Sequence, residues 1–387
     1  MVFKTYKMND MKGKQGLVCM GLLLVLSSCH TGKQITASGL QRKDFQTEVN
    51  GQHTDLFTLS NKQGMEVCIT NYGARVVSIL VPDRNGKRED VVCGFSTITE
   101  YMEQRQNFGS TVGRYIGRIL NARFTLDGVE YKLVPNNGKS GHISHGGNPG
   151  FADRIWKVEQ ADTHRVRLSY LSPDGENGFP GNLKVTLVYS LGEDDNALDL
   201  TYEATTDAPT VLNLSHHSFF NISGNFTKSV EDQQLWVDAD RFTPYDDKKC
   251  VTGEDLPVAG TPLDFRMPHA IGECIDADHP QLKVVNGYDH TWELNTKGDD
   301  TRPAAWVYDP ASGRKMEIFT TEPGMQIYTG NGLKGKMTGK GGIAYPFRSA
   351  VCFETMHFQD SPNQPGFPST VLRPGEVFRS HTVYKFE

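Results

Sequence analysis

Two adjacent histidines stand in the stretch LNLSHHSFFN, Leu212 to Asn221, among leucines and phenylalanines. An imidazole gives or takes a proton near neutral pH, so each is a candidate general acid or base. Neighbouring side chains of a strand point to opposite faces, so at most one of the two faces a given site. Alternation groups His216 with aliphatic residues and His217 with polar ones. A structural role for both is the alternative, because polar residues in strands are usually solvated or hydrogen-bonded. A β-bulge would void the alternation.

A carboxylate occupies a similar position near the end of the chain, in SAVCFETMHF, Ser349 to Phe358. In an extended strand Glu354 shares one face with Cys352 and Met356. Burial among apolar side chains raises the pKa of a carboxyl group and makes it a better proton acceptor near neutrality. The alternative is an edge strand with Glu354 in water.

Three further stretches carry polar residues that a β protein does not need for its core. GRYIGRI holds Arg114 and Arg118, whose guanidinium groups suit either a ligand or a structural salt bridge. SGHISHGG holds His142 and His145 before a glycine pair, but their spacing favours a metal only on a helix, and this stretch is not helical. GYDHTWEL places Asp289 beside aromatic residues, a combination found in sugar sites.

Composition and missing motifs narrow the chemistry. The 387 residues include 40 basic and 46 acidic ones, and this balance does not favour a nucleic-acid partner. The sequence contains no Gly-x-Ser-x-Gly elbow, Walker loop or dinucleotide fingerprint. The remaining set of His, Glu, Arg and Asp suits proton transfer on a polyhydroxylated substrate without a cofactor.

The elements that must position these residues are strands. From about residue 50 onward, short alternating runs are separated by Asn-Gly and Asp-Gly pairs, which are strong hairpin signals. No amphipathic helix of three turns is evident, and glycine and proline interrupt most candidates. The chain is therefore predicted to be all-β, a single large antiparallel sandwich. A propeller is a weaker alternative, since no fixed-period repeat occurs.

The first thirty residues differ from the rest. Four lysines precede the apolar run Gly16 to Leu26, which is too short to span a bilayer and is typical of a secretory signal. LSSC, Leu26 to Cys29, resembles the lipobox of bacterial lipoproteins, in which the cysteine is lipidated. An ordinary cleaved signal with a chance cysteine is the alternative. The prediction is a bacterial cell-envelope lipoprotein, periplasmic or anchored to the outer membrane, whose membrane contact is a lipid anchor at Cys29.

These observations divide the chain into three parts. We expect a signal peptide over residues 1–28, a flexible tether over 29–50 and one β-sandwich domain over 51–387. Five scattered cysteines beyond the signal contain no Cys-x-x-Cys pair, which argues against a zinc knuckle and a dense disulfide framework. The sequence does not choose a disulfide pairing.

From about Thr58 to the C-terminus the chain resembles the aldose 1-epimerase (galactose mutarotase) family. The resemblance is carried by TNYGARVVSILVPDRNG, GRYIGRI, SPDGENGFPGNL, NLSHHSFFNISG, GYDHTWEL, PGMQIYTGN and FETMHFQDSPNQPGFPSTVLRPGEVF. The order and number of these motifs make chance agreement improbable.

The resemblance implies a large β-sandwich, the galactose mutarotase-like supersandwich, with the sugar in an open cleft. It implies interconversion of the α and β anomers of a free aldose such as galactose or glucose. By the same resemblance Glu354 is the general base and His217 the general acid. The residues expected to hold sugar hydroxyls are Arg118, His145, Asp289 and Gln326. No cofactor is required for this chemistry, an accessory Ca²⁺ is left open, and a monomer is expected.

Three residues depart from the family pattern. Gly117 stands where many members have asparagine, Ser144 where leucine is usual, and His216 where asparagine commonly precedes the catalytic histidine. None of the three removes the implied acid or base. A non-catalytic sugar-binding lipoprotein of the same fold is the alternative function. Action on a sugar phosphate or on the reducing end of an oligosaccharide is a third.

Overall fold

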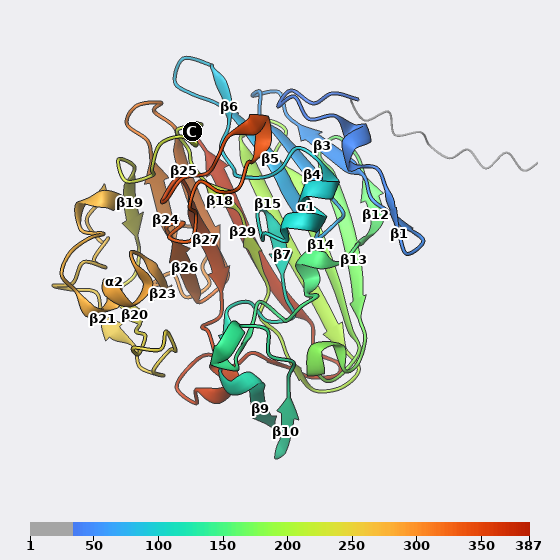
Figure 1. Ribbon diagram of the computed structural model, residues 1–387, viewed down its shortest axis with the longest axis vertical. Helices are drawn as coiled ribbons and strands as arrows, with labels where there is room; N and C mark the ends of the chain where they lie inside the picture. Colours follow the sequence, from blue (N-terminus) through green and yellow to red (C-terminus); the bar gives the residue numbers. More distant parts are fainter. Residues whose placement is uncertain (1–33) are drawn as a thin grey trace, which may run out of the picture. The chain divides into compact units, whose positions relative to one another are not determined.

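A nine-stranded antiparallel sheet is the largest element of the computed structural model, which describes residues 34–387 (Figure 1). Its strands, in spatial order, are β12 (Lys157–Ala161), β13 (Arg165–Ser172), β14 (Leu183–Leu191), β15 (Ala197–Thr206), β29 (Phe378–Phe386), β25 (Lys315–Thr320), β24 (Ala305–Tyr308), β19 (Gln234–Val237) and β22 (His269–Ala270). The last strand of the chain, β29, thus lies in the middle of the sheet.

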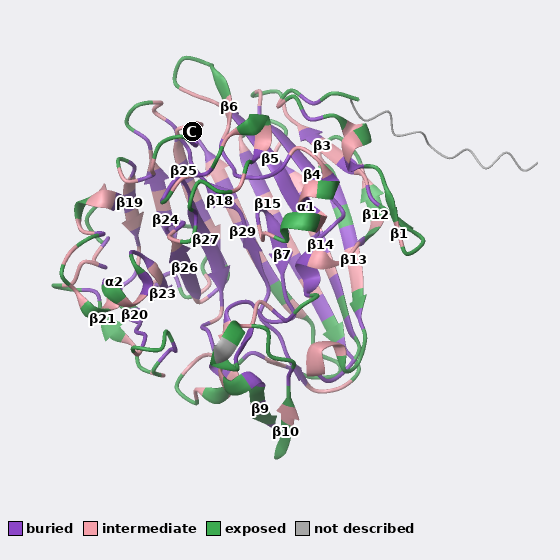
Figure 2. Ribbon diagram, in the orientation of Figure 1, coloured by how far each residue is buried: buried purple, intermediate pink, exposed green. Residues whose placement is uncertain are grey.

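Two smaller antiparallel sheets pack with it. The six-stranded sheet is β18 (Phe219–Phe220), β27 (Val351–Met356), β26 (Gly324–Tyr328), β23 (Asp289–Glu293), β20 (Arg241–Thr243) and β21 (Leu256–Pro257). The four-stranded sheet is β3 (Leu56–Ser60), β4 (Glu66–Thr70), β5 (Arg75–Pro82) and β6 (Arg88–Asp90). The central strands of these sheets are mostly buried (Figure 2).

Five two-stranded pairs complete the strand set of the described residues. They are β1 (Glu48–Val49) with β2 (Gln52–His53), β7 (Ser110–Val112) with β17 (Ser215–His217), β8 (Arg118–Ile119) with β11 (Ile143–Ser144), β9 (Arg123–Leu126) with β10 (Val129–Lys132), and β16 (Thr210–Val211) with β28 (Val371–Leu372). The α-helices are short: α1 (Ile98–Gln104) and α2 (Pro280–Val285). The 3₁₀ helices are η1 (Arg42–Phe45), η2 (Leu120–Ala122), η3 (Gly138–Ser140), η4 (Phe151–Asp153), η5 (Glu176–Gly178), η6 (Ile271–Glu273), η7 (Lys340–Gly342) and η8 (Ser361–Asn363).

The hairpin signals correspond to real turns. β9 and β10 are joined by Asp127 and Gly128, both with positive φ, the conformation that a two-residue hairpin with right-handed strand twist requires. β14 alternates between buried and partly or fully exposed residues, because one face of the large sheet covers the core and the other meets solvent. The prediction of an all-β antiparallel fold is confirmed.

Strand β27 lies between two layers. Phe353 belongs to the main hydrophobic core, and the Tyr384 hydroxyl of β29 donates to its carbonyl oxygen at 3.0 Å. Thr355 contacts Thr382 of β29 through their hydroxyl groups at 2.7 Å. The odd-numbered side chains of β27 therefore face the nine-stranded sheet, and Glu354 points the other way, as alternation predicts.

The N-terminal part of the described chain is packed. Leu40 and Phe45 belong to a second hydrophobic cluster, which also contains Phe219 and Cys352, and Phe45 is fully buried. The Arg42 guanidinium donates to the Asp55 carboxylate. Within the stretch 29–50 that was expected to be a flexible tether, Leu40 and Phe45 thus pack against the domain, because burying their apolar side chains is favourable.

The signal peptide and Cys29 lie outside the described residues. Among residues 34–387 no helix is both long and apolar enough to cross a bilayer. The five cysteines in this range are all free thiols: Cys68, Cys93, Cys250, Cys274 and Cys352.

Candidate active site

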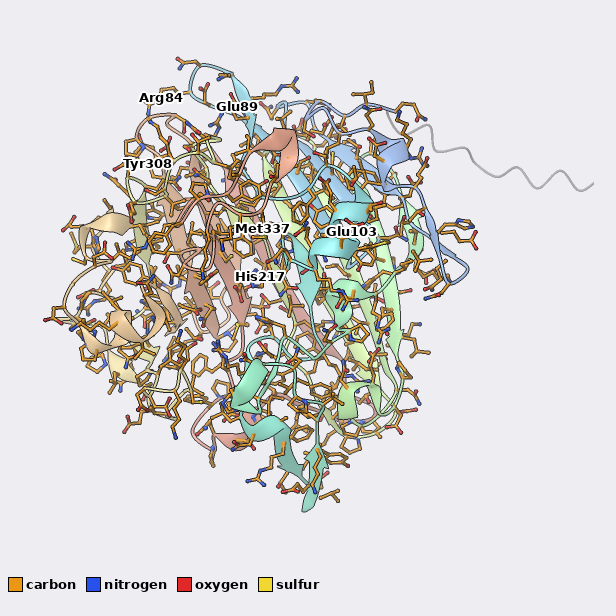
Figure 3. The ribbon with its side chains drawn as sticks, viewed as in Figure 1. Arg84, Glu89, Glu103, His217, Tyr308 and Met337 are labelled. Carbon is orange, nitrogen blue, oxygen red and sulfur yellow. The ribbon has the colours of Figure 1, made fainter. Side chains whose placement is uncertain are left out.

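One cavity of about 250 Å³ gathers all six residues that the sequence assigned to the site. Its lining comprises Gln106, Asn107, Gly117, Arg118, Ser144, His145, His217, Phe219, Asp289, Gln326, Tyr328, Glu354, Met356 and Gln359. His217 lies near the centre of the view in Figure 3. The cavity is polar with a few apolar walls, the composition expected for a small polyhydroxylated ligand.

Strand register brings three of these residues together. Gln326 of β26 is directly opposite Glu354 of β27, so the two side chains share a face. Gln326 is also opposite Thr291 of β23, and Asp289 lies two residues before Thr291 on that strand. The Gln326 side-chain amide donates to Asp289 at 2.7 Å and accepts from the Thr291 hydroxyl at 2.6 Å. Its orientation is thereby fixed.

The central pair is His217 and Glu354. Nε2 of His217 lies 3.2 Å from Oε1 of Glu354, and both side chains are more than nine-tenths buried. Burial, and secondarily the nearby Asp289, raises the pKa of Glu354 well above its usual range. Burial, with the neighbouring His145, lowers the pKa of His217 well below its usual range. Such a pair can hold one proton between its members, which is what a paired acid and base requires.

Aromatic and sulfur groups hold the His217 ring. It stacks on Phe219 with ring centroids 5.1 Å apart and meets His145 edge to face at 5.5 Å. Its other nitrogen, Nδ1, lies 3.6 Å from the thiol sulfur of Cys352. The ring orientation is thus set on every side by packing, and Nε2 is left for Glu354 and for a ligand.

Arg118 and His145 also line the cavity. The Arg118 guanidinium has no hydrogen-bond partner within residues 34–387, yet its charge lowers the pKa of Asp289 against the larger effect of burial, which raises it. Burial lowers the pKa of His145 to about 4, so this ring is neutral at pH 7. A free guanidinium, a neutral imidazole and a carboxylate are suitable partners for hydroxyl groups.

Other candidates have structural roles. The buried Arg114 donates to the carbonyl oxygens of Pro173, Pro180 and Gly181 and does not line the cavity. His142 faces the Cys250 thiol at 3.2 Å.

His216 contacts the large sheet. Its Nε2 lies 2.7 Å from the Ser218 hydroxyl, and its ring packs on Tyr189 and Tyr384. β17 pairs with β7 without a bulge, so the alternation that separates His216 from His217 holds.

Sequence reasoning did not assign Phe219, Tyr328 or Gln359 to the site. Phe219 has the same parity as His217, a signal that was present in the sequence. Tyr328 and Gln359 reach the cavity through strand register and a loop contact, which no local pattern reveals.

One group of side chains within the described residues could hold a metal ion. The ligand atoms of His217, Cys352 and Glu354 all lie within 4.8 Å of one another. An ion there would occupy the acid and base themselves.

Comparison with known proteins gives the family of the chain. The family model described as aldose 1-epimerase matches residues 55–385. The chain belongs to the aldose 1-epimerase family. The epimerase is 39% identical over 330 residues to the galactose mutarotase of Sus scrofa, covering 85% of this chain and 93% of that one. It is 36% identical over 339 residues to the aldose 1-epimerase of Escherichia coli K12, covering 87% of this chain and 96% of that one.

Solved structures match the fold of the epimerase as well. An aldose epimerase homologue from C. elegans superimposes with a TM-score of 0.79 at 31% identity, covering 86% of this chain and 99% of that one. The galactose 1-epimerase from Lactobacillus acidophilus NCFM superimposes with a TM-score of 0.76 at 28% identity, covering 88% of this chain and 96% of that one. The epimerase is therefore an isomerase with the mutarotase fold.

Proposed function

We propose that the protein interconverts the α and β anomers of a free aldose, with Glu354 as general base and His217 as general acid. The observation that carries this proposal is the contact of 3.2 Å between two buried side chains that both line the cavity. Glu354 takes the proton of the C1 hydroxyl while His217 protonates the ring oxygen, and the bond between C1 and the ring oxygen breaks. The open aldehyde rotates about C1–C2, and closure on its other face reverses both proton transfers.

The location of the shared proton matters for this mechanism. Burial favours the neutral form of both side chains, with the proton of the pair on Glu354. The assigned roles need the proton on His217. A C1 hydroxyl that donates to Glu354 stabilises its ionised form, so sugar binding itself shifts the pair toward the catalytic state.

Substrate binding is assigned to the other cavity residues. We assign the binding of hydroxyl groups to Arg118, His145, Asp289 and Gln326, which line the cavity. Galactose, named for two of the relatives, is the first substrate to test. The lining accounts for proton transfer with side chains alone, so we expect neither a metal nor another cofactor to be needed, and a monomer to be active.

The test is polarimetric mutarotation of galactose by variants. Glu354→Gln and His217→Asn are each expected to lower the rate at least about a hundredfold, the range typical of a lost acid or base. The exposed Glu103, labelled in Figure 3, supplies the matched control Glu103→Gln, which should match the wild-type rate. Near-wild-type rates in either site variant would refute the roles. Tight sugar binding without accelerated exchange would support the sugar-binding alternative. A rate abolished by EDTA and restored by Ca²⁺ would refute the cofactor-free reaction.

The cellular location is a separate part of the proposal. Cys29 follows an apolar run and closes the lipobox-like LSSC, which supports a lipid-anchored protein of the bacterial envelope. Expression with radiolabelled palmitate should label the wild-type chain and leave Cys29→Ser unlabelled, with the unlabelled protein released into the soluble fraction. Equal labelling of both chains would contradict an anchor at this cysteine.

A further inference from the structure

Gly117 and Gln359 lie in close contact in the wall of the cavity. Gly117 has a φ of +74°, and a Cβ atom built on it would lie 2.5 Å from Cγ, 3.0 Å from Cδ and 3.2 Å from Oε1 of Gln359. No real Cβ tolerates the shortest of these distances. The glutamine side chain therefore fills the volume that any side chain at position 117 would need.

The amide of Gln359 joins both sides of the site. Its Oε1 accepts from the backbone N–H of Arg118 at 3.2 Å. Its Nε2 donates to the Tyr245 hydroxyl at 2.6 Å and to Oε1 of Gln326 at 3.3 Å. The Gln326 amide in turn donates to the same Tyr245 hydroxyl at 3.4 Å.

These contacts use both donors of the Gln359 amide within the protein. The side chain is buried, with 4% of its surface exposed. It connects residues from distant parts of the chain: Arg118 in β8, Gln326 in β26, and the turn after β27 in which Gln359 itself lies. An amide whose two N–H groups already donate within the protein has none left for a ligand. It affects a ligand by fixing the orientation of the residues it contacts.

We propose that Gln359 is a positioning residue of the epimerase, matched to Gly117, that fixes Arg118 and Gln326 at the spacing a sugar needs. This inference rests on the proposed function. Gln359 lines the cavity, but both donors of its amide are used within the protein, so we assign it the orientation of binding groups and no catalytic role. The pair also accounts for Gly117: a side chain there would displace the glutamine and release both neighbours.

The first experiment compares two replacements of Gln359. Gln359→Met keeps most of the volume and removes all hydrogen bonds, whereas Gln359→Ala removes both volume and bonds. Each is expected to raise KM for galactose about tenfold and to change kcat less than about threefold, since binding groups lose their orientation while His217 and Glu354 stay in place. A merely structural residue would lower the folded fraction without this split. An unchanged KM in both variants would overturn the proposal.

The second experiment is a double-mutant cycle with Gly117→Asn. Asparagine is among the residues best able to adopt positive φ, so the main obstacle to it is Gln359. In the wild-type background Gly117→Asn should lower kcat/KM at least about tenfold, and in the Gln359→Ala background less than about twofold further. In the Gln359→Met background the cost should remain, because the volume is still filled. An equal decrease of kcat/KM on Gly117→Asn substitution in all three backgrounds would overturn the pairing.

Two readouts separate this inference from the proposed function. Coupling between positions 117 and 359 is measurable in thermal unfolding without sugar, and galactose binding is measurable by calorimetry without turnover. A wild-type protein that binds galactose but does not catalyse mutarotation would refute the proposed function. The positioning role would then be decided by whether the Gln359 variants bind galactose more weakly than the wild type. If Gln359→Ala does not fold, Gln359→Ser replaces it as the variant with less volume; if Gln359→Met does not fold, Gln359→Glu replaces it. This variant keeps the volume and the acceptor for Arg118 but cannot donate to Gln326, so it should raise KM as Gln359→Met does.

Discussion

His217 and Glu354 are 6% and 3% exposed, and this burial changes the proton affinity of the two side chains in opposite directions. The imidazole becomes a weaker base and the carboxylate a stronger one. In water the two groups differ by about two pKa units. Burial acts against this difference and favours the neutral pair with the proton on Glu354, so the C1 hydroxyl of a bound sugar is needed to move the proton to His217.

The pH dependence of the rate follows from these directions. Activity needs one proton on the pair, so it is lost when a second proton binds and when the first one leaves. The lowered pKa of His217 moves the acidic loss below pH 6.5, and the raised pKa of Glu354 moves the alkaline loss upward from its usual acidic range. On the acidic side we expect kcat/KM for galactose to hold its value down to pH 6.5 and to fall only well below it. A polarimetric profile with an acidic midpoint at or above 6.5 would contradict this expectation.

Single residues were predictable where a local rule applied. Alternation alone separates His217 from His216, and it places Glu354 away from the core face that Phe353 takes. The roles of Arg118, His145, Asp289 and Gln326 came from motif resemblance, because their convergence depends on strands far apart in sequence. Gln359 was missed because nothing in its own neighbourhood marks it as a partner of Gly117.

At the scale of elements, two arginines four residues apart have different environments. Arg114 is buried and holds the loop between β13 and β14 by donating to Ser172 and to the carbonyl oxygens of Pro173, Pro180 and Gly181. Arg118 lines the cavity, and its guanidinium has no hydrogen-bond partner in the described part of the chain. The GRYIGRI motif therefore joins a structural and a functional residue.

Matched substitutions test this division. Arg114→Met should lower the free energy of unfolding by at least about 2 kcal/mol, because several buried carbonyl oxygens lose their donor. Arg118→Met should change that free energy by less than about 1 kcal/mol and instead raise KM. Urea unfolding gives the free energy of unfolding of each variant, and galactose kinetics give its KM. An Arg114→Met protein as stable as the wild type would contradict the structural role.

The strands and their hairpins were predictable because their signals are local: alternation, Asn-Gly and Asp-Gly. The order of strands in the sheets was not. β29 inserts between β15 and β25, and β27 pairs with both β18 and β26, through contacts over long sequence separations. The packed segment before β3 was also missed, since two apolar residues, Leu40 and Phe45, are too few to make a periodic pattern.

For the whole molecule, buried neutral histidines predict sensitivity to acid. Burial lowers the pKa of His216 and of His290 to about 3 in the folded state, against about 6.5 in an unfolded chain. Between these values the unfolded state binds more protons, so stability is complete above pH 6.5 and is lost as the pH falls toward 3. Each histidine should remove about 1.4 kcal/mol per pH unit in this window.

Urea unfolding at pH 7 and pH 5 measures this loss. His216→Asn should reduce the difference between the two pH values, since one of the titrating groups is gone. The same slope in the variant and the wild type would show that His216 does not contribute. Asparagine retains a polar group near Ser218, which limits other changes at this position.

The packed segment that begins at Gln34 has a consequence for where the enzyme works. If Cys29 carries the lipid, only five peptide steps separate the anchor from Gln34, a reach of at most about 18 Å. So short a connection would keep the molecule close to the bilayer surface, with which it would diffuse. Its encounters with sugars would be limited to those that pass within one protein diameter of the membrane, such as sugars leaving a transporter or a neighbouring glycosidase.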